Sequence, residues 1–187
     1  MESDRDEEER QLMEFEPLAQ WDPNGGLVLM TEEVDPVDIS VEDDLEPSAW
    51  AGIEIAKLFL NEGETVIYTV GRDQQYQNNV VADTAPLVTA PVVVLVNNKT
   101  ASASEIVASS LHDNCRAVLV GERTFGKGLI QSVFELLDGS GVVVTVGKYV
   151  TPNHRDINGN GIEPDYRNLP AWSDVTQHLS QCSKLQG

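Results

Sequence analysis

The sequence predicts an α/β domain that follows a strongly acidic N-terminal segment. Two short unbroken apolar runs, PVVVLVN (91–97) and RAVLVG (116–121), flank a helix-like stretch, ASASEIVASSLHDN (101–114). Unbroken apolar runs of this length are typical of strands that are buried on both faces of a sheet. Two such strands joined by a helix form a βαβ unit, with parallel strands and a right-handed crossover. The α/β class follows from this unit.

Each remaining segment after residue 47 has its own signal. Apolar residues at helical spacing predict an amphipathic helix over 48–63, which ends at a glycine. β-branched and aromatic residues predict a strand over 64–71, followed by an exposed connection over 73–90. Two β-like runs around a D-G-S-G turn predict a hairpin over 129–150. The stretch 172–185 is weakly helical, and the chain has no internal repeat.

Charge divides the chain into two parts. Residues 1–50 contain 17 acidic and 2 basic side chains, whereas residues 51–187 contain 14 and 10. Because self-repulsion is high and little apolar surface is available, residues 1–47 are expected to be largely disordered or extended. Residues 48–187 are then the folded domain. The acidic segment can be a solvated tail or a docking arm, and the sequence leaves both open.

The composition excludes several function classes. A formal charge of −19 argues against a general binder of nucleic acid or anionic membranes, because phosphate affinity needs basic side chains. No run of 18 apolar residues occurs, so no integral membrane segment is expected. The acidic start resembles neither a secretory signal nor a transit peptide. Cys115 and Cys182 form no C-x-x-C pair, so we expect neither a disulfide framework nor a zinc site.

Ser102, Lys127 and Gln131 are the candidate catalytic residues. Ser102 begins the 101–114 helix directly after a buried strand, which is where α/β sheets place their ligands. Free N–H groups and the helix dipole at that point can stabilise an oxyanion. Lys127 stands between two glycines and near apolar residues, and a lysine can act as a base where burial favours its neutral form. Gln131, four residues later, can hold that amine in place.

A purely structural interpretation of these residues stays open from spacing alone. The S-x-x-E pattern of 102–105 is also a capping box, and most such serines only cap helices. Lys127 can equally be a surface lysine in a glycine turn. Histidine is the usual base for a serine, but the three histidines lie late in the helix, in a loop and near the C-terminus: His112, His154 and His178.

Two other motifs match ligand-binding patterns, one for phosphate and one for calcium, but each match is incomplete. Residues 121–128 match the phosphate-binding pattern G-x-x-x-x-G-K, but Gly128 stands where a Ser or Thr hydroxyl holds Mg²⁺, and the following segment reads as a strand. Residues 156–161 copy the first half of a calcium-binding EF-hand loop, but Arg167 stands where a bidentate Glu is needed. We therefore expect a Gly/Asn turn there and no bound metal.

The stretch NKTASASEIVASSLHDNCRAVLVGERTFGKGLIQ resembles the carboxyl-terminal processing peptidases, serine proteases with a Ser–Lys dyad. The similarity runs over residues 51–170, includes the D-G-S-G hairpin, and is closest to chloroplast members from plants. It implies a ClpP/crotonase-like α/β core. It also implies that Ser102 is the nucleophile, Lys127 the general base and Gln131 its orienting partner. The backbone N–H of Ala103 would then donate to the oxyanion.

The resemblance implies an activity as well as a fold. A protein substrate would be cleaved near its C-terminus through an acyl-enzyme, without a metal or nucleotide cofactor. For plant relatives the substrate would be the precursor of a photosystem II subunit, in the chloroplast thylakoid lumen. The alternative is a truncated, inactive relative that acts as a binding or regulatory module. A nucleotide-binding protein is a third interpretation.

The chain also departs from the family pattern. Residues 1–50 contain nothing that resembles the PDZ domain of the family. The family strand L-D-L-R-x-N-x-G-G, whose glycine gives a second oxyanion N–H, is represented at best by DPNGGLV (22–28). If Val28 were joined to Ala51, the sequence would match the family, so residues 29–50 would be an insertion. This hypothesis requires Gly25 or Gly26 to lie near Ser102.

Overall fold

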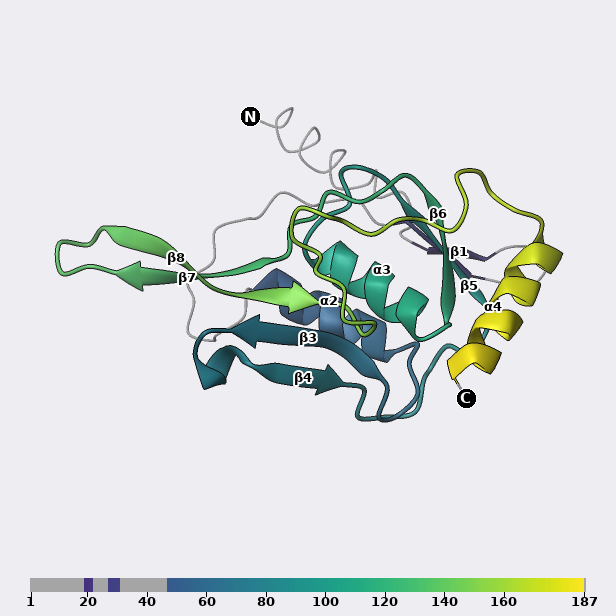
Figure 1. Cartoon of the computed structure of the whole chain (residues 1–187), viewed down its shortest axis with the longest axis horizontal. Helices are drawn as coiled ribbons and strands as arrows, with labels where there is room; N and C mark the ends of the chain where they lie inside the picture. Colours follow the sequence, from purple (N-terminus) through teal and green to yellow (C-terminus); the bar gives the residue numbers. More distant parts are fainter. Residues whose placement is uncertain (1–18, 22–26, 31–46, 187) are drawn as a thin grey trace, which may run out of the picture.

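The computed structural model describes residues 19–21, 27–30 and 47–186, and it confirms a mixed α/β fold (Figure 1). The described strands form two four-stranded sheets, in the orders β1-β2-β5-β6 and β4-β3-β8-β7. The helices are α2 (Pro47–Lys57), α3 (Ala103–Asp113) and α4 (Trp172–Gln186). The strands are β1 (Ala19–Trp21), β2 (Leu27–Met30), β3 (Thr65–Gly71), β4 (Asn78–Val81), β5 (Val92–Val96), β6 (Ala117–Gly121), β7 (Leu129–Glu135) and β8 (Gly141–Val150).

The first sheet contains the predicted βαβ unit. β5, α3 and β6 follow one another, and β5 and β6 pair in parallel from Val92 opposite Ala117 to Val96 opposite Gly121. Every residue of β5 except Leu95, and of β6 except Gly121, is buried, as the unbroken apolar runs predicted. β2 extends the sheet by pairing in parallel with β5, and β1 pairs antiparallel with β2. The remainder of the acidic segment lies outside the described residues.

The second sheet is antiparallel and contains the predicted hairpin. β7 and β8 pair from Leu129 opposite Lys148 to Glu135 opposite Gly141, and their far end projects from the body of the protein (Figure 1). The segment 73–90, expected to be an exposed connection, is largely exposed but also contains regular structure. A short 3-10 turn, η1 (Gln74–Tyr76), leads into β4, which pairs with β3. β4 has the largely exposed sequence NNVV, which is too short to show an apolar pattern, so its pairing with β3 defines this strand.

α2 and α3 pack closely beside the site. A Cβ atom on Gly52 of α2 would lie 2.7 Å from the carbonyl oxygen of Ala103, so only glycine fits where α2 crosses the start of α3. α2 ends at Lys57, earlier than the glycine at 63 that the sequence suggested. Phe59, just past that end, is buried in the core, and Arg116 donates a hydrogen bond to its carbonyl oxygen at 2.7 Å. Tertiary contacts therefore bury the side chain and pair the carbonyl group of Phe59, just past the end of the helix.

A disulfide joins Cys115 to Cys182, with 5.6 Å between their Cα atoms, so the expectation of no disulfide is wrong. Cys115 follows α3, and Cys182 lies on α4, whose Val175 packs against Val118 and other buried residues of the parallel sheet. The fold thus brings together two cysteines that are 67 residues apart and carry no spacing motif. Among the described helices, none has the length and apolar character needed to cross a bilayer.

Candidate active site

Ser102 occupies a strained turn between β5 and α3. It is the N-cap of α3 and has φ 52° and ψ −118°, a backbone conformation that residues other than glycine rarely adopt. Such strain costs about 1–3 kcal/mol and is concentrated at functional sites. The turn follows the carboxyl end of β5, as the sequence predicted for Ser102. Ser102 itself is half-buried, so its side chain lies at the surface of the core.

The buried carboxylate of Glu105 ties this turn to the loop that carries Lys127. Glu105 is fully buried, and its Oε2 accepts hydrogen bonds from the backbone N–H of Ser102 at 3.0 Å and of Lys127 at 2.8 Å. Because both bonds end on one oxygen, the two backbone nitrogens are at most about 6 Å apart. The structure therefore brings Ser102 and Lys127 together, although 25 residues separate them in the sequence.

The other oxygen of Glu105 fixes the loop before Lys127. Its Oε1 accepts hydrogen bonds from the Thr124 hydroxyl at 2.5 Å and from the Gly126 N–H at 2.7 Å. The Thr124 Oγ1 in turn accepts a hydrogen bond from the N–H of Ile162 at 2.8 Å. Four donors thus surround one carboxylate at the first turn of α3, where the helix dipole also favours negative charge. No basic side chain contributes to these four bonds.

Sequence reasoning identified Glu105 only as part of a capping box and missed Thr124. The capping interaction exists, because Glu105 accepts the Ser102 N–H, but the same carboxylate also binds a second segment. The signal for Glu105 was its place in the S-x-x-E pattern. Thr124 had no signal, because nothing local shows that its hydroxyl points into the core.

Lys127 and Gln131 do not lie on one regular strand. β7 begins at Leu129, after Lys127, and its pairing is irregular between Ile130 and Gln131. The even spacing therefore does not by itself relate the two side chains. Lys127 is half-buried and Gln131 is exposed. The orienting role of Gln131 stays a prediction.

Ala103 is the first residue of α3, so its N–H belongs to the four at a helix start that lack an intrahelical partner. The next two residues donate to local carbonyls, Ser104 to Ala101 at 3.1 Å and Glu105 to Ser102 at 2.9 Å. The role of Ala103 as an oxyanion donor stays a prediction. Gly25 and Gly26, the hypothetical source of a second donor, lie outside the described residues.

The structure gives no support to the two ligand motifs. In the phosphate-loop pattern, the N–H groups of Gly126 and Lys127 bind the Glu105 carboxylate, which would repel a phosphate, and the segment leads into β7 rather than a helix. In the EF-hand pattern, Asp156 pairs with Lys148 and accepts the Asn158 N–H at 3.0 Å. In the described ranges no three or more His, Cys, Asp and Glu side chains converge as metal ligands.

Each of the three histidines contacts a partner other than Ser102. His112, at the far end of α3, places its two ring nitrogens 2.9 Å from Asp113 and 3.2 Å from Asp165. Burial by itself would lower the pKa of His112, but these two carboxylates outweigh it and raise the pKa to about 9. Burial would raise the pKa of each aspartate, whereas the hydrogen bond with His112 lowers it. His154 stacks on Tyr68, with 4.6 Å between the ring centres.

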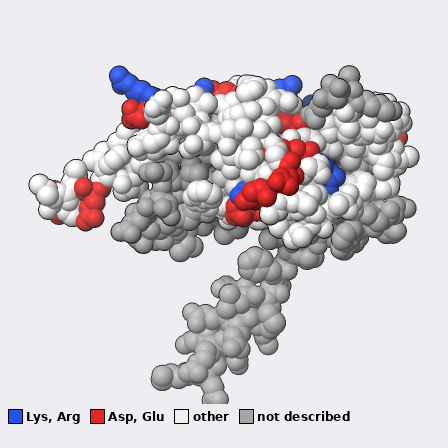
Figure 2. All heavy atoms as spheres, turned by 90° about the horizontal axis from the view of Figure 1, so that it is seen from below, with Lys and Arg blue, Asp and Glu red and all other residues white. Residues whose placement is uncertain are grey.

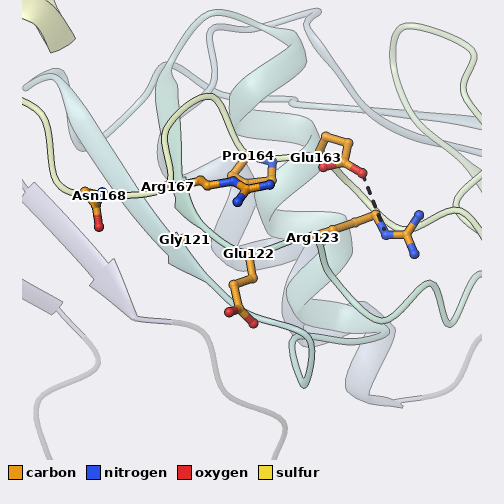
Figure 3. Close-up of a pocket in the computed structure, with 7 residues that line it drawn as sticks. All are labelled: Gly121, Glu122, Arg123, Glu163, Pro164, Arg167 and Asn168. Carbon is orange, nitrogen blue, oxygen red and sulfur yellow. Dashed lines mark ion pairs between the residues drawn. The ribbon is translucent and has the colours of Figure 1, made fainter.

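A cavity of about 580 Å³ opens at the carboxyl end of β6 (Figure 3). β5 runs parallel to β6, so the carboxyl end of β5, which leads to Ser102, lies at the same end of the sheet. Glu122, in the wall of the cavity, donates its N–H to the Val96 carbonyl at the end of β5. Arg123 and Glu163 face each other across part of it, 3.7 Å apart. Its lining residues are Gly121, Glu122, Arg123, Glu163, Pro164, Arg167 and Asn168.

The sequence model of peptidase family S41 matches residues 48–168. The chain belongs to this family. The predicted resemblance to carboxyl-terminal processing peptidases is thereby confirmed, and the matched range contains both Ser102 and Lys127.

Three relatives show how far the similarity of this S41 chain extends. It is 71% identical over 148 residues to "Carboxyl-terminal-processing peptidase 1, chloroplastic" of Arabidopsis thaliana. The aligned residues make up 79% of this chain and 30% of that protein. A "Carboxyl-terminal-processing protease" of the cyanobacterium Picosynechococcus is 62% identical over 115 residues, which is 62% of this chain and 27% of that protein. The solved structure titled "Photosystem II D1 C-terminal processing protease" superposes with a TM-score of 0.61 at 36% identity, over 84% of this chain and 39% of that one. The chain therefore spans about a third of the length of the relatives it matches.

Proposed function

We propose that this chain carries the catalytic centre of a serine endopeptidase that cleaves protein substrates near their C-terminus. The observation that carries the proposal is the Glu105 carboxylate, one oxygen of which holds the backbones of both Ser102 and Lys127. A Ser–Lys dyad needs these two residues side by side at a helix start. The strained turn at Ser102 supports the same assignment.

The chemistry follows from those positions. The amine of Lys127 takes the proton of the Ser102 hydroxyl as the oxygen attacks the carbonyl carbon of the scissile peptide bond. The N–H of Ala103, aided by the dipole of α3, stabilises the oxyanion. The C–N bond then breaks, and the leaving amine takes the proton from Lys127. Water, deprotonated by the same lysine, hydrolyses the acyl-enzyme ester and releases Ser102. Gln131 holds the lysine amine in position.

The substrate and compartment are proposed from the relatives. The Arabidopsis relative is named chloroplastic, and the solved structure is titled a processing protease of photosystem II D1. We propose the same setting here: a chloroplast protein, in the thylakoid lumen, that acts on the C-terminal region of a photosystem II subunit precursor. The mechanism requires neither a metal nor a nucleotide.

The test is peptidase activity of the purified chain on an unfolded protein with an apolar C-terminus. Ser102→Ala and Lys127→Ala are expected to abolish turnover, while Ser104→Ala, two residues along the same helix, keeps it within about twofold. A short activated ester, which needs only the dyad, should acylate Ser102 and give a burst of product. Turnover that survives in Ser102→Ala would contradict the assignment.

The second candidate is a relative that binds substrate without cleaving it. It is favoured by the register shift between Ile130 and Gln131, because a broken strand period does not by itself hold Gln131 beside Lys127. Removing one oxyanion donor typically lowers the rate by about 10²–10³-fold, so an incomplete site would be slow rather than inert. A folded chain that binds the substrate but shows no ester burst would establish this second function.

A further inference from the structure

We propose that the free edge of β7 binds the substrate as an added β-strand, which guides an extended apolar peptide to Ser102. This inference rests on the proposed peptidase function and gives that site its substrate-binding element. β7 is the last strand in the sheet order β4-β3-β8-β7, and no described strand pairs with its outer edge. In Figure 1 the outer half of β7 and β8 projects beyond the other described elements. An unpaired strand edge offers a row of N–H and C=O groups to another chain.

The register of the hairpin shows which backbone groups face outward. Leu136 donates its N–H to the Ser140 carbonyl across the turn at 2.6 Å. In an antiparallel pair of strands, every second pair of opposed residues exchanges backbone hydrogen bonds. The N–H and C=O groups of the residues in between point away from the partner strand. Counting back from Leu136, Phe134 bonds to β8, whereas Val133 and Glu135 direct their N–H and C=O groups to the free edge. These outward groups are the proposed partners of the peptide backbone.

This edge is continuous with the candidate dyad. β7 begins at Leu129, two residues after Lys127, and Gln131 lies on the strand itself. At about 3.3 Å per residue, Val133 lies roughly 20 Å along the chain from Lys127. A peptide that reaches both Ser102 and Val133 is therefore about six residues or longer. The opposite edge of the hairpin, along the outer half of β8, lacks this connection to Lys127.

The side chains of the hairpin define the chemistry of the peptide. Val133 lies opposite Val143 on one face, and Phe134 lies opposite Val142 on the other, with all four between 43% and 58% exposed. An added strand would place its own alternate side chains beside these two apolar pairs, because neighbouring strands share the period of two. The peptide is therefore expected to be apolar at consecutive positions.

The charge of the hairpin further limits which peptides can bind to it. Residues 129–147 contain Glu135 and Asp138 but neither lysine nor arginine. On the face shown in Figure 2, the projecting end of the molecule is mostly uncharged, with acidic side chains gathered at its tip. An acidic peptide would be repelled there, so the occupant is a neutral or basic apolar segment of a protein substrate.

The test measures peptide binding to the Ser102→Ala chain, so that it does not depend on catalysis. The probe is a neutral twelve-residue apolar peptide with a fluorescent label, and the readout is polarisation. Val133→Pro removes an N–H that faces the free edge, where proline is tolerated in strands, and should raise Kd about tenfold or more. Val143→Pro is the matched control, because it removes the outward N–H of the opposed residue on the other edge and should leave Kd within about twofold.

A second series leaves the protein unchanged. Peptides N-methylated at every other residue lose one row of N–H donors, so one of the two alternating series should fail to bind and the other should bind like the parent. Equal effects of Val133→Pro and Val143→Pro, or of the two methylated series, would overturn the proposal. A folded chain that binds no peptide would also overturn it. A third contrary result would be a dimer formed through the β7 edges of two copies, if Val133→Pro dissociates that dimer but leaves the Kd of the peptide unchanged. The ester burst of the unmodified chain reports on the dyad separately, so failure of this proposal and failure of the peptidase assignment give different results.

Discussion

Replacing Glu105 with glutamine removes the one negative charge that joins the two halves of the candidate site. The carboxylate accepts hydrogen bonds from Ser102, Thr124, Gly126 and Lys127, two on each oxygen. Glutamine has a single acceptor oxygen. If that oxygen keeps the hydrogen bonds from the N–H groups of Ser102 and Lys127, the amide NH₂ faces the other two donors, the Thr124 hydroxyl and the Gly126 N–H. The Thr124 hydroxyl can rotate to accept from the amide, but the N–H of Gly126 cannot.

The cost follows from these four bonds. An unpaired buried N–H costs about 1–3 kcal/mol, and each remaining bond loses charge assistance worth roughly 1 kcal/mol. Three bonds remain, so we expect Glu105→Gln to lower the free energy of unfolding by about 4–6 kcal/mol. Displacement of the turn by an ångström can reduce the rate about 10²-fold, so the ester burst should slow accordingly.

The assay is urea unfolding at pH 7, with burst kinetics on the same preparations. Glu54→Gln is the control, because Glu54 is an exposed glutamate whose pairing with Lys57 at 2.8 Å lies on the surface. Exposed pairs contribute about 0–1 kcal/mol, so this variant should stay close to the parent. A Glu105→Gln protein within 0.5 kcal/mol of Glu54→Gln would refute the claim that the buried carboxylate organises the site.

Three further predictions concern strain, the disulfide and pH. Ser102→Gly should be about 1 kcal/mol more stable than Ser102→Ala in urea, because glycine relieves the positive φ at a smaller entropic cost; equal stability would mean that the turn is unstrained. The double variant Cys115→Ser, Cys182→Ser opens a closure of 67 residues and should lose roughly 4 kcal/mol, whereas an unchanged melting temperature after reduction would show that the bridge contributes nothing. The pKa of His112 is raised from 6.5 to about 9, so its contribution is complete below pH 6.5 and is lost as the pH rises through 9. Because the pKa values of Asp113 and Asp165 are lowered, their contribution is present above pH 3.8 and is lost as the pH falls. Melting temperature should therefore be highest between about pH 4 and 6.5, and His112→Asn should flatten its decline toward pH 9; a parent-like decline in that variant would assign the effect to another group.

Much of the fold could be predicted because its signals are local. The runs that became β5 and β6 are apolar at every position, since both faces of a central parallel strand are buried. The hairpin of β7 and β8 was evident from its turn residues. β4 could not be predicted in this way, because a short, largely exposed edge strand is defined by its pairing partner and not by its own pattern.

In the candidate site, too, the features with a local sequence signal could be predicted and the others could not. Ser102 and Lys127 could be selected by motif, and the place of Ser102 after a buried strand could be argued from the α/β class alone. Their proximity could not be predicted, because it depends on one carboxylate that binds two residues 25 positions apart in the chain. The even spacing of Lys127 and Gln131 does not by itself relate their side chains, because an irregularity in the ladder with β8 interrupts the period of two.

The sequence by itself determined the α/β class, the family and the candidate catalytic residues, because each depends on the order of residues within a short stretch. Only the tertiary structure decided that Glu105 joins Ser102 to Lys127, that Cys115 meets Cys182, and that no described strand pairs with the outer edge of β7. These features are contacts between segments that are distant in the chain. Their energies come from burial and from hydrogen-bond partners that exist only once the sheets and helices have packed.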